Sequence, residues 1–200
     1  MRSGFRILVL MVIVVGLLAC SGEEQTETVL DDAAIAAFLD KAMDPGEGQE
    51  RLDFMIGEFD VTIRVWLDPT QPPIESPASA INTWVLGHRF IRTVLSGYIV
   101  GEPYDGIGYV GFNNVSEQYE ATYMDSGGTG MEWFTGTMDS TGETAKMSAT
   151  IDDAVTGKPT AIEMRLQIAP NGDHITELWE ADRTGTMVRI IELQYTRRNS

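Results

Sequence analysis

The sequence contains only one cysteine, Cys20, and only two histidines, His88 and His174, among its 200 residues. A single thiol excludes an internal disulfide, so the fold must be stable through its core alone. Two histidines are too few for a zinc site unless carboxylates complete it. Basic residues are also scarce, with 14 lysines and arginines against 30 acidic residues, and the resulting negative charge argues against binding to nucleic acid.

No apolar run is long enough to cross a membrane as a helix. The longest, residues 7–18, reaches roughly 18 Å at ~1.5 Å per residue, against the ~30 Å hydrocarbon core of a bilayer. It follows Arg2 and Arg6 and ends next to a small residue and Cys20, which is the pattern of a cleaved signal peptide. We expect residues 1–19 to be removed, and because they carry two arginines and no acid, the net charge changes from −16 to −18.

The end of this segment, Leu17-Leu18-Ala19-Cys20, resembles the bacterial lipobox. The resemblance implies that Cys20 becomes the first mature residue and carries diacylglycerol and an N-linked acyl chain such as palmitate. Three acyl chains exceed the two signals that stable membrane anchoring needs. Ser21, in place of Asp after the cysteine, implies an outer-membrane address facing the periplasm in a bacterium with two membranes. The alternative is an ordinary signal peptide that ends at a chance thiol.

We therefore predict a lipid-anchored protein of the cell envelope, whose partner is the membrane that receives the lipid on Cys20. Four segments are expected: a signal peptide over 1–19, the lipidated cysteine and a flexible tether over 20–30, a short helix and turn over 31–48, and a folded domain over 49–198. The tether is expected because its first residues hold no large apolar side chain.

A short helix is expected before the folded domain. Asp31 or Asp32 can cap it, and Ile35, Phe38 and Leu39 recur at helical spacing. A proline and glycine pair at 45–46 ends it. A second helical turn over 49–56 leads into the sheet.

From residue 59 onward the apolar residues alternate with polar ones, and this period of two indicates strands with one buried face. Turn residues such as Asn113-Asn114, Thr141-Gly142 and Asn171-Gly172 separate the alternating runs. The expected strands cover residues 59–67, 79–86, 88–99, 104–112, 117–124, 130–138, 144–151, 159–168, 174–181 and 186–196.

The pattern predicts an all-β, mainly antiparallel domain, an up-and-down meander of about ten strands preceded by short N-terminal helices. A meander of that length tends to close into a barrel, because closure removes the exposed strand edges. No segment after residue 57 is helical enough to form a crossover connection, which excludes a parallel sheet.

Five spaced motifs occur in order over about residues 50–196. They are Leu52-Asp53-Phe54-Met55-Ile56-Gly57-Glu58-Phe59-Asp60-Val61, Trp84-Val85-Leu86-Gly87-His88-Arg89-Phe90, Gly101-Glu102-Pro103-Tyr104-Asp105-Gly106-Ile107-Gly108, Gly111-Phe112-Asn113-Asn114 and Thr156-Gly157-Lys158-Pro159. Together they resemble the bacterial domain-of-unknown-function family 1579, a family that supplies no activity.

A looser similarity links the chain to the calycins, the barrels that include lipocalins and fatty-acid-binding proteins. Calycins begin with a short helix and a Gly-x-Trp motif, whose tryptophan is stacked by a basic residue of the last strand. Here Gly57-Glu58-Phe59 has Phe in place of Trp, and the resemblance makes Arg197 or Arg198 the basic partner. A cation over a phenyl ring is still favourable, by ~0.5–1 kcal/mol.

Two further patterns are interpreted as structural. Gly106, Gly108 and Gly111 have the spacing of a dinucleotide-binding loop, but a turn and a strand follow where that loop needs a helix. We interpret them as positions where the strand bends or a large cross-strand side chain lies flat. Acidic residues at turns are interpreted as acceptors for turn amides rather than as calcium ligands, since calcium needs six or more oxygens. These residues are Asp125, Asp139, Asp152, Asp153 and Asp173.

The strands also carry large aromatic and methionine side chains, which in a wide barrel either pack as core or line a ligand cavity. The leading hypothesis is a non-enzymatic barrel that binds a small hydrophobic or amphiphilic molecule, with no cofactor. The candidate ligand-binding residues are Arg89, Arg92, Tyr98, Tyr123, Trp133, Glu177 and Trp179.

Two alternatives stay open. One is a barrel enzyme that acts on a lipid-like substrate, or a haem-binding barrel that uses His88 or His174, although each histidine sits beside a turn and is better explained by a structural role. The other is an envelope scaffold without a ligand. Spacing alone assembles no Ser, His and acid triad, so no catalytic and no metal-binding residue is assigned.

Overall fold

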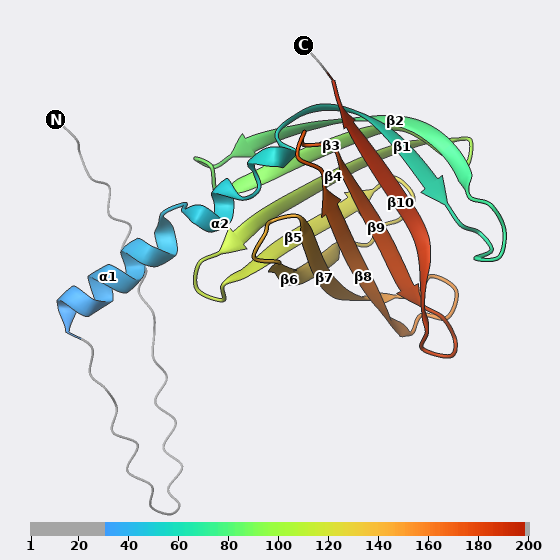
Figure 1. The fold of residues 1–200 in the computed structure, drawn as a ribbon. Coiled ribbons are helices and arrows are strands. Elements are labelled where there is room, and N and C mark those ends of the chain that lie inside the picture. Colours follow the sequence, from blue (N-terminus) through green and yellow to red (C-terminus); the bar gives the residue numbers. More distant parts are fainter. Residues whose placement is uncertain (1–30, 199–200) are drawn as a thin grey trace, which may run out of the picture.

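The computed structural model describes residues 31–198 and contains ten strands preceded by short helices (Figure 1). The helical elements are α1 (Asp32–Met43), α2 (Glu47–Glu50) and a 3-10 turn, η1 (Asp53–Met55). The strands are β1 (Gly57–Val65), β2 (Ile74–Val85), β3 (Phe90–Ile99), β4 (Glu102–Asn113), β5 (Gln118–Asp125), β6 (Glu132–Met138), β7 (Thr144–Asp152), β8 (Pro159–Ile168), β9 (His174–Ala181) and β10 (Met187–Arg197).

The ten strands form one closed barrel in sequence order, and β1 closes it by pairing with β10. Every pairing of neighbouring strands is antiparallel. The predicted all-β meander and its closure are therefore confirmed, as is the exclusion of a parallel sheet. Consecutive strands alternate in direction, so the barrel has one end beside the helices and an opposite end formed by the β1–β2, β3–β4, β5–β6, β7–β8 and β9–β10 loops.

The largest boundary difference is at β2, which begins at Ile74 rather than at residue 79. The earlier start places Pro77 inside a strand, where its missing N–H normally removes a ladder hydrogen bond. Pro77 pairs with Thr62 of β1, but the pairing of β2 with β3 begins only at Ala78. The proline therefore lies outside the hydrogen-bond ladder between β2 and β3.

Of the aspartates expected to accept from turn amides, Asp125, Asp139 and Asp153 do so. Within residues 31–198 the Asp152 side chain accepts no hydrogen bond, and Asp173 accepts from the N–H of Arg197 instead. Asp139 Oδ1 accepts from the N–H of Gly142 at 2.8 Å, and Asp182 Oδ1 accepts from the N–H of Thr184 at 2.8 Å. Gly142 and Gly185 take φ of 77° and 83°, a left-handed conformation that favours glycine. Within residues 31–198, no group of three His, Cys, Asp or Glu side chains is placed to hold a metal ion.

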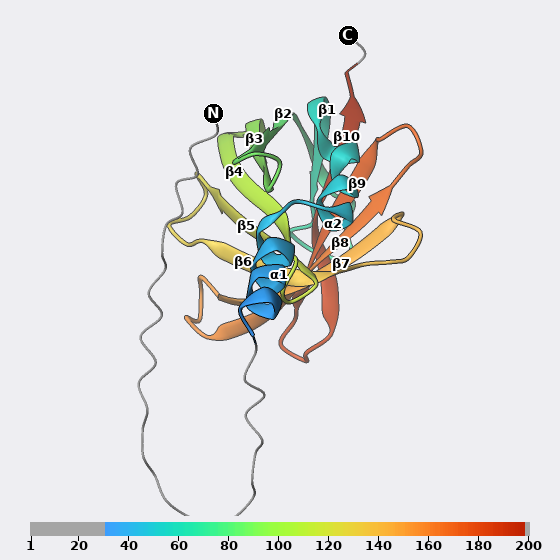
Figure 2. The same cartoon turned by 90° about the vertical axis from the view of Figure 1, so that its left-hand side faces the viewer.

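The helix α1 projects from one end of the barrel, and Figure 2 views the molecule from that side. The Asp31 carboxylate caps it by accepting from the N–H of Ala34, as expected. Its apolar side chains Ile35, Phe38 and Leu39 are exposed. The helix touches the barrel through its last turn, where Asn114 donates to the carbonyl oxygens of Lys41 and Asp44. In the part of the chain that the structure describes, no helix has the length and apolar composition needed to cross a bilayer.

Residues of α2 and the turn after it form a plug over the helix end of the barrel. Gln49 is buried and donates to the carbonyl oxygen of Phe112 at 2.8 Å. The Tyr119 hydroxyl donates to the carbonyl oxygen of Gly48 at 3.1 Å, and Leu52 packs into the interior with 2% of its surface exposed. This end of the barrel is therefore closed.

Arg197 joins the end of β10 to the start of β1 and to the plug. Its guanidinium lies 4.8 Å from the centroid of the Phe59 ring and donates to the carbonyl oxygens of Phe54 and Ile56. Gly57 has a φ of 135°, and a Cβ there would lie 2.6 Å from Arg197 Nη1. Of the two arginines proposed from the calycin resemblance, Arg197 stacks on Phe59, whereas the exposed Arg198 pairs with Asp60.

Replacing Arg197 by alanine is expected to lower the free energy of unfolding by about 3 kcal/mol, because two carbonyl oxygens lose a charged donor and Phe59 loses its cation. Arg198→Ala is the matched control and should cost under about 1 kcal/mol, since its ion pair is exposed. Urea unfolding measures both. Equal losses in the two variants would show that Arg197 does not close the barrel.

Candidate functional site

The barrel interior packs as two separate clusters rather than as one core. One cluster lies on β1, β2, β3, β4 and β10 and includes Phe59, Ile63 and Leu95. The other lies on β3 and β5 to β8 and includes Phe134 and Ile162. Residues from both clusters line an apolar cavity of about 140 Å³. This cavity is the candidate functional site.

The two ends of the cavity differ in exposure. Leu52 and Met55 of the plug line the helix end, and Leu52 is almost completely buried. Tyr123, near the end of β5, and Glu132, at the start of β6, line the opposite end and are both partly exposed. Access from solvent is therefore at the Tyr123 and Glu132 end, which we call the mouth.

Methionines from three consecutive strands form one wall. Met138 lies on β6, Met147 on β7 and Met164 on β8, and Met147 is the cross-strand partner of Met164. An unbranched thioether side chain adopts several conformations at low cost and fills irregular space. The wall can therefore adjust to the shape of a small apolar molecule.

A hydrogen-bonded chain of phenols lies near the mouth. The Tyr104 hydroxyl donates to Asp125 Oδ2 at 2.8 Å, and the Tyr123 hydroxyl oxygen is 3.3 Å from that of Tyr104. Asp125 Oδ1 also accepts from the N–H of Gly127 at 2.8 Å. Burial and the nearby phenol raise the pKa of Tyr104 well above its usual range. The phenols therefore stay protonated, and Tyr104 remains a donor to Asp125.

Glycines of β4 make room for the Tyr123 ring. A Cβ at Gly106 would overlap the Tyr123 hydroxyl, and one at Gly108 would lie 3.1 Å from the ring. Gly111 faces the Phe90 ring in the same way. The interpretation of this glycine pattern as space for flat cross-strand side chains is confirmed.

Several polar side chains lining the cavity make no hydrogen bond within residues 31–198, and two of them, Tyr195 and Glu132, are titratable groups with a shifted pKa. Tyr195 is 9% exposed, and burial raises the pKa of its hydroxyl with no hydrogen-bond partner contributing. Burial also raises the pKa of the Glu132 carboxyl, and the negative charge of Asp125 raises it further. A partly buried carboxyl with a raised pKa inside a cavity is characteristic of functional sites.

Among the residues predicted to bind a ligand, Tyr123 lines the cavity and the other six do not. Arg92, Tyr98 and Trp133 are exposed on the outer face, because their neighbours in sequence Ile91, Ile99 and Phe134 point inward. Arg89 lies in the β2–β3 loop and donates to the carbonyl oxygen of Met43.

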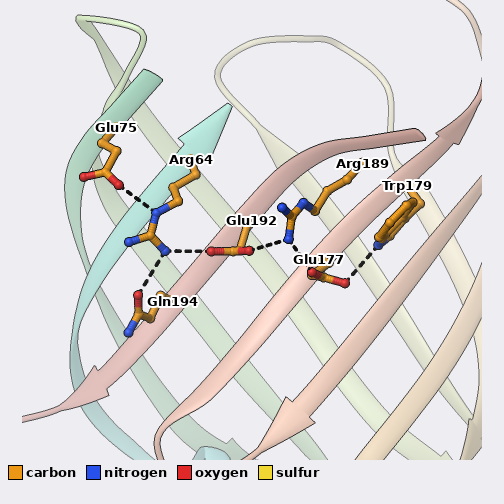
Figure 3. A network of polar contacts seen from close by, with 7 residues as sticks. All are labelled: Arg64, Glu75, Glu177, Trp179, Arg189, Glu192 and Gln194. Carbon is orange, nitrogen blue, oxygen red and sulfur yellow. Dashed lines mark hydrogen bonds and ion pairs between the residues drawn. The ribbon is translucent and has the colours of Figure 1, made fainter. Parts of the chain in front are cut away.

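Glu177 and Trp179 belong to a polar network on the outer wall (Figure 3). Arg189 lies between two carboxylates, 2.7 Å from Glu177 and 2.8 Å from Glu192, and the Trp179 indole donates to Glu177 at 3.0 Å. Arg64 continues the network to Glu192 and Glu75. Glu177 and Glu192 are nearly buried, and each accepts hydrogen bonds from two partners. Together with Glu75 they link β2, β1, β10 and β9.

Three cavity residues were not predicted from the sequence: Tyr104, Glu132 and Tyr195. The alternation of side chains along β6 indicates that Glu132 points inward, because Phe134 two residues later is fully buried on the inner face. Such an inward carboxylate in an apolar face is unusual enough to mark a site. The pairing that brings Tyr195 of β10 to the same cavity has no local signal.

Neither histidine lines the cavity. His88 is exposed in the β2–β3 loop, and its ring is 5.6 Å from that of Trp84. His174 is buried at the helix end, where it stacks on Tyr195 with ring centroids 4.3 Å apart and meets Phe59 edge to face. The cavity thus offers no imidazole to a haem iron.

The comparisons with known proteins give a family and a fold. The model of a family described as "Protein of unknown function (DUF1579)" matches residues 44–197. No curated protein matches the chain. Among solved structures, the crystal structure of Rv2717c from M. tuberculosis is similar, with a TM-score of 0.57 and 18% identity over 78% of this chain and 100% of that one. This likeness concerns the fold alone.

The buried His174 should make stability depend on pH. Burial, with a further contribution from the charge of Arg197, lowers the pKa of His174 to about 4 from its ordinary 6.5. The unfolded chain binds the proton more tightly, so the stabilising contribution of neutral His174 is lost as pH falls from about 6.5 to about 4. Over that range the wild type should lose about 2–3 kcal/mol more than His174→Phe.

Urea unfolding at several pH values measures this difference. His88→Phe is the control, and its pH dependence should match that of the wild type because His88 is exposed. A parallel pH dependence of wild type and His174→Phe would contradict the prediction.

Proposed function

The chain belongs to the DUF1579 family of proteins of unknown function, and we propose that it binds a small, mainly apolar molecule inside its barrel. The observation that carries this proposal is the cavity of about 140 Å³ between two core clusters that do not merge. Protein interiors are otherwise close-packed. An empty apolar space of this size lowers stability, and a ligand that fills it offsets that loss.

The size and lining of the cavity support a small ligand. An apolar cavity of ~150 Å³ in another protein holds benzene. Ligand sites are mostly apolar with a few placed polar groups, and here the aliphatic and methionine walls lead to Tyr123, Glu132 and Tyr195. The adjustable wall of Met138, Met147 and Met164 admits ligands somewhat larger than the resting volume.

We also propose that the barrel works in the cell envelope, tethered by a lipid on Cys20. The support is the sequence alone: a charged start, a short apolar run and the Leu17-Leu18-Ala19-Cys20 motif. Residues 1–30, including Cys20 and the expected tether, lie outside the described residues. An acyl anchor suits a strongly acidic domain, because the domain's charge would not itself attract anionic headgroups.

Benzene should bind the wild-type barrel and shift the methyl NMR signals of Met138, Met147 and Met164 in protein labelled with ¹³C-methyl methionine. Ala145 lines the cavity between Met138 and Leu166. Ala145→Leu fills the space and should weaken binding by about tenfold or more. Ala161→Leu, the same change at an exposed position of β8, should leave it unchanged.

The absence of any methyl shift in the wild type at saturating benzene would refute the ligand proposal. So would an equal loss of affinity in Ala161→Leu. Native mass spectrometry of protein purified from its own host provides a second test, in which a small molecule should co-purify.

Lipidation is tested separately, by expressing the full chain with its own first 19 residues in a bacterial host. The wild type should fractionate with membranes, and its N-terminal peptide should have the mass of a triacylated peptide beginning at Cys20. Cys20→Ser should release the protein into the soluble fraction, whereas Ser21→Ala should stay membrane-bound. Membrane retention of Cys20→Ser would contradict the tether.

A further inference from the structure

The polar atoms that the cavity leaves without a partner restrict the chemistry of its ligand. Tyr195 is more than nine-tenths buried, lines the cavity and makes no hydrogen bond within residues 31–198. The Glu132 carboxyl also lines the cavity, and no hydrogen bond is among the interactions that shift its pKa. Buried polar groups are normally hydrogen-bonded. A ligand with a polar atom next to Glu132 would supply a partner there that the described residues do not.

The free groups at the mouth are mainly acceptors. The Tyr104 hydroxyl donates its hydrogen bond to Asp125. The Tyr104 and Tyr123 oxygens are close enough for Tyr123 to donate to Tyr104. With its proton engaged, the Tyr123 oxygen presents lone pairs to the cavity. Glu132, when ionised, is acceptor only. The ligand must therefore bring donors to this end.

The ionisable groups at the mouth are all acids. Glu132 lies in the lining, and Asp125 is close enough for its charge to act on Glu132. Among the described residues that line the cavity, there is no Lys, Arg or His to balance them. The arginines that a carboxylate-headed ligand would need, Arg89 and Arg92, lie outside the barrel. A fatty-acid carboxylate at the mouth would face repulsion, whereas a cation would be attracted.

We propose that the ligand is an amine: an apolar body that lies against the methionine wall and a protonated nitrogen that binds Glu132 at the mouth. The inference rests on the proposed function and specifies its ligand class. An ammonium supplies up to three donors, enough for Glu132 and for the Tyr123 oxygen. A charge-assisted hydrogen bond in a partly desolvated site is about twice as strong as a neutral one.

The test compares benzylamine, benzyl alcohol and benzoate, which share a phenyl body and differ in the charge of the polar group. Binding is followed by the methyl signals of Met138, Met147 and Met164 at about pH 7, where the amine is protonated and benzoate is ionised. Benzylamine should bind about tenfold or more tightly than benzyl alcohol, and benzoate should bind more weakly than both.

Glu132→Gln should remove the preference for benzylamine over benzyl alcohol while leaving the affinity for the alcohol within about twofold. Glu102→Gln is the matched control, because it removes one negative charge from an exposed position at the same end of the barrel. It should keep the preference. Glu132→Gln should not lower the urea midpoint, since the carboxyl has no partner to lose and is repelled by Asp125.

The outcomes separate the two proposals. If benzyl alcohol or benzoate binds as tightly as benzylamine, or if Glu132→Gln retains the preference, the amine inference is wrong and the cavity remains a ligand site. If none of the three probes moves the methionine methyls, the proposed function fails as well. Loss of the preference in Glu102→Gln would assign it to overall charge and would also overturn the inference.

Discussion

The closure of ten strands into one tube is the constraint on which the rest of the structure depends. Eight strands enclose an interior that side chains can just fill, and the diameter grows with each added strand. Here the inner faces of opposite walls form two clusters that do not merge. The cavity is the space between them. The cavity exists because β1 pairs with β10 and because Arg197, at the end of β10, donates hydrogen bonds to the carbonyl oxygens of Phe54 and Ile56 in the plug.

Carboxylates on the outer and inner faces of the barrel differ in whether an arginine pairs with them. On the outer face, Glu177 and Glu192 share Arg189, and the guanidinium of Arg189 lies 4.2 Å from the centroid of the Trp66 ring. These nearly buried acids are compensated by charges from neighbouring strands. On the inner face, Glu132 has no such compensation. Glu132 therefore differs from Glu177 and Glu192, which are compensated by arginines of neighbouring strands.

The strand and turn pattern of the sequence predicted most of the architecture. The calycin resemblance predicted a contact of Phe59 with Arg197 or Arg198, and the structure shows that the partner is Arg197. The site was predicted only in part, because assigning Arg92 or Glu177 to a ligand requires knowing which face of its strand points inward. Where apolar residues occur on both faces, as around β3, alternation does not decide this. Trp179 is a large apolar side chain on the outer face because Arg165, 4.1 Å from its ring centroid, covers it there.

The sequence by itself determined the strand periodicity, the aspartate and glycine turns, the absence of a disulfide and the family. These are local properties, set by side-chain alternation, backbone conformation and short motifs. Only the tertiary structure decided that β5, β6 and β10 bring Tyr123, Glu132 and Tyr195 to one cavity and that neither histidine reaches it. The reason is that inward direction and barrel width depend on the pairing of all ten strands at once, and no single segment encodes that pairing.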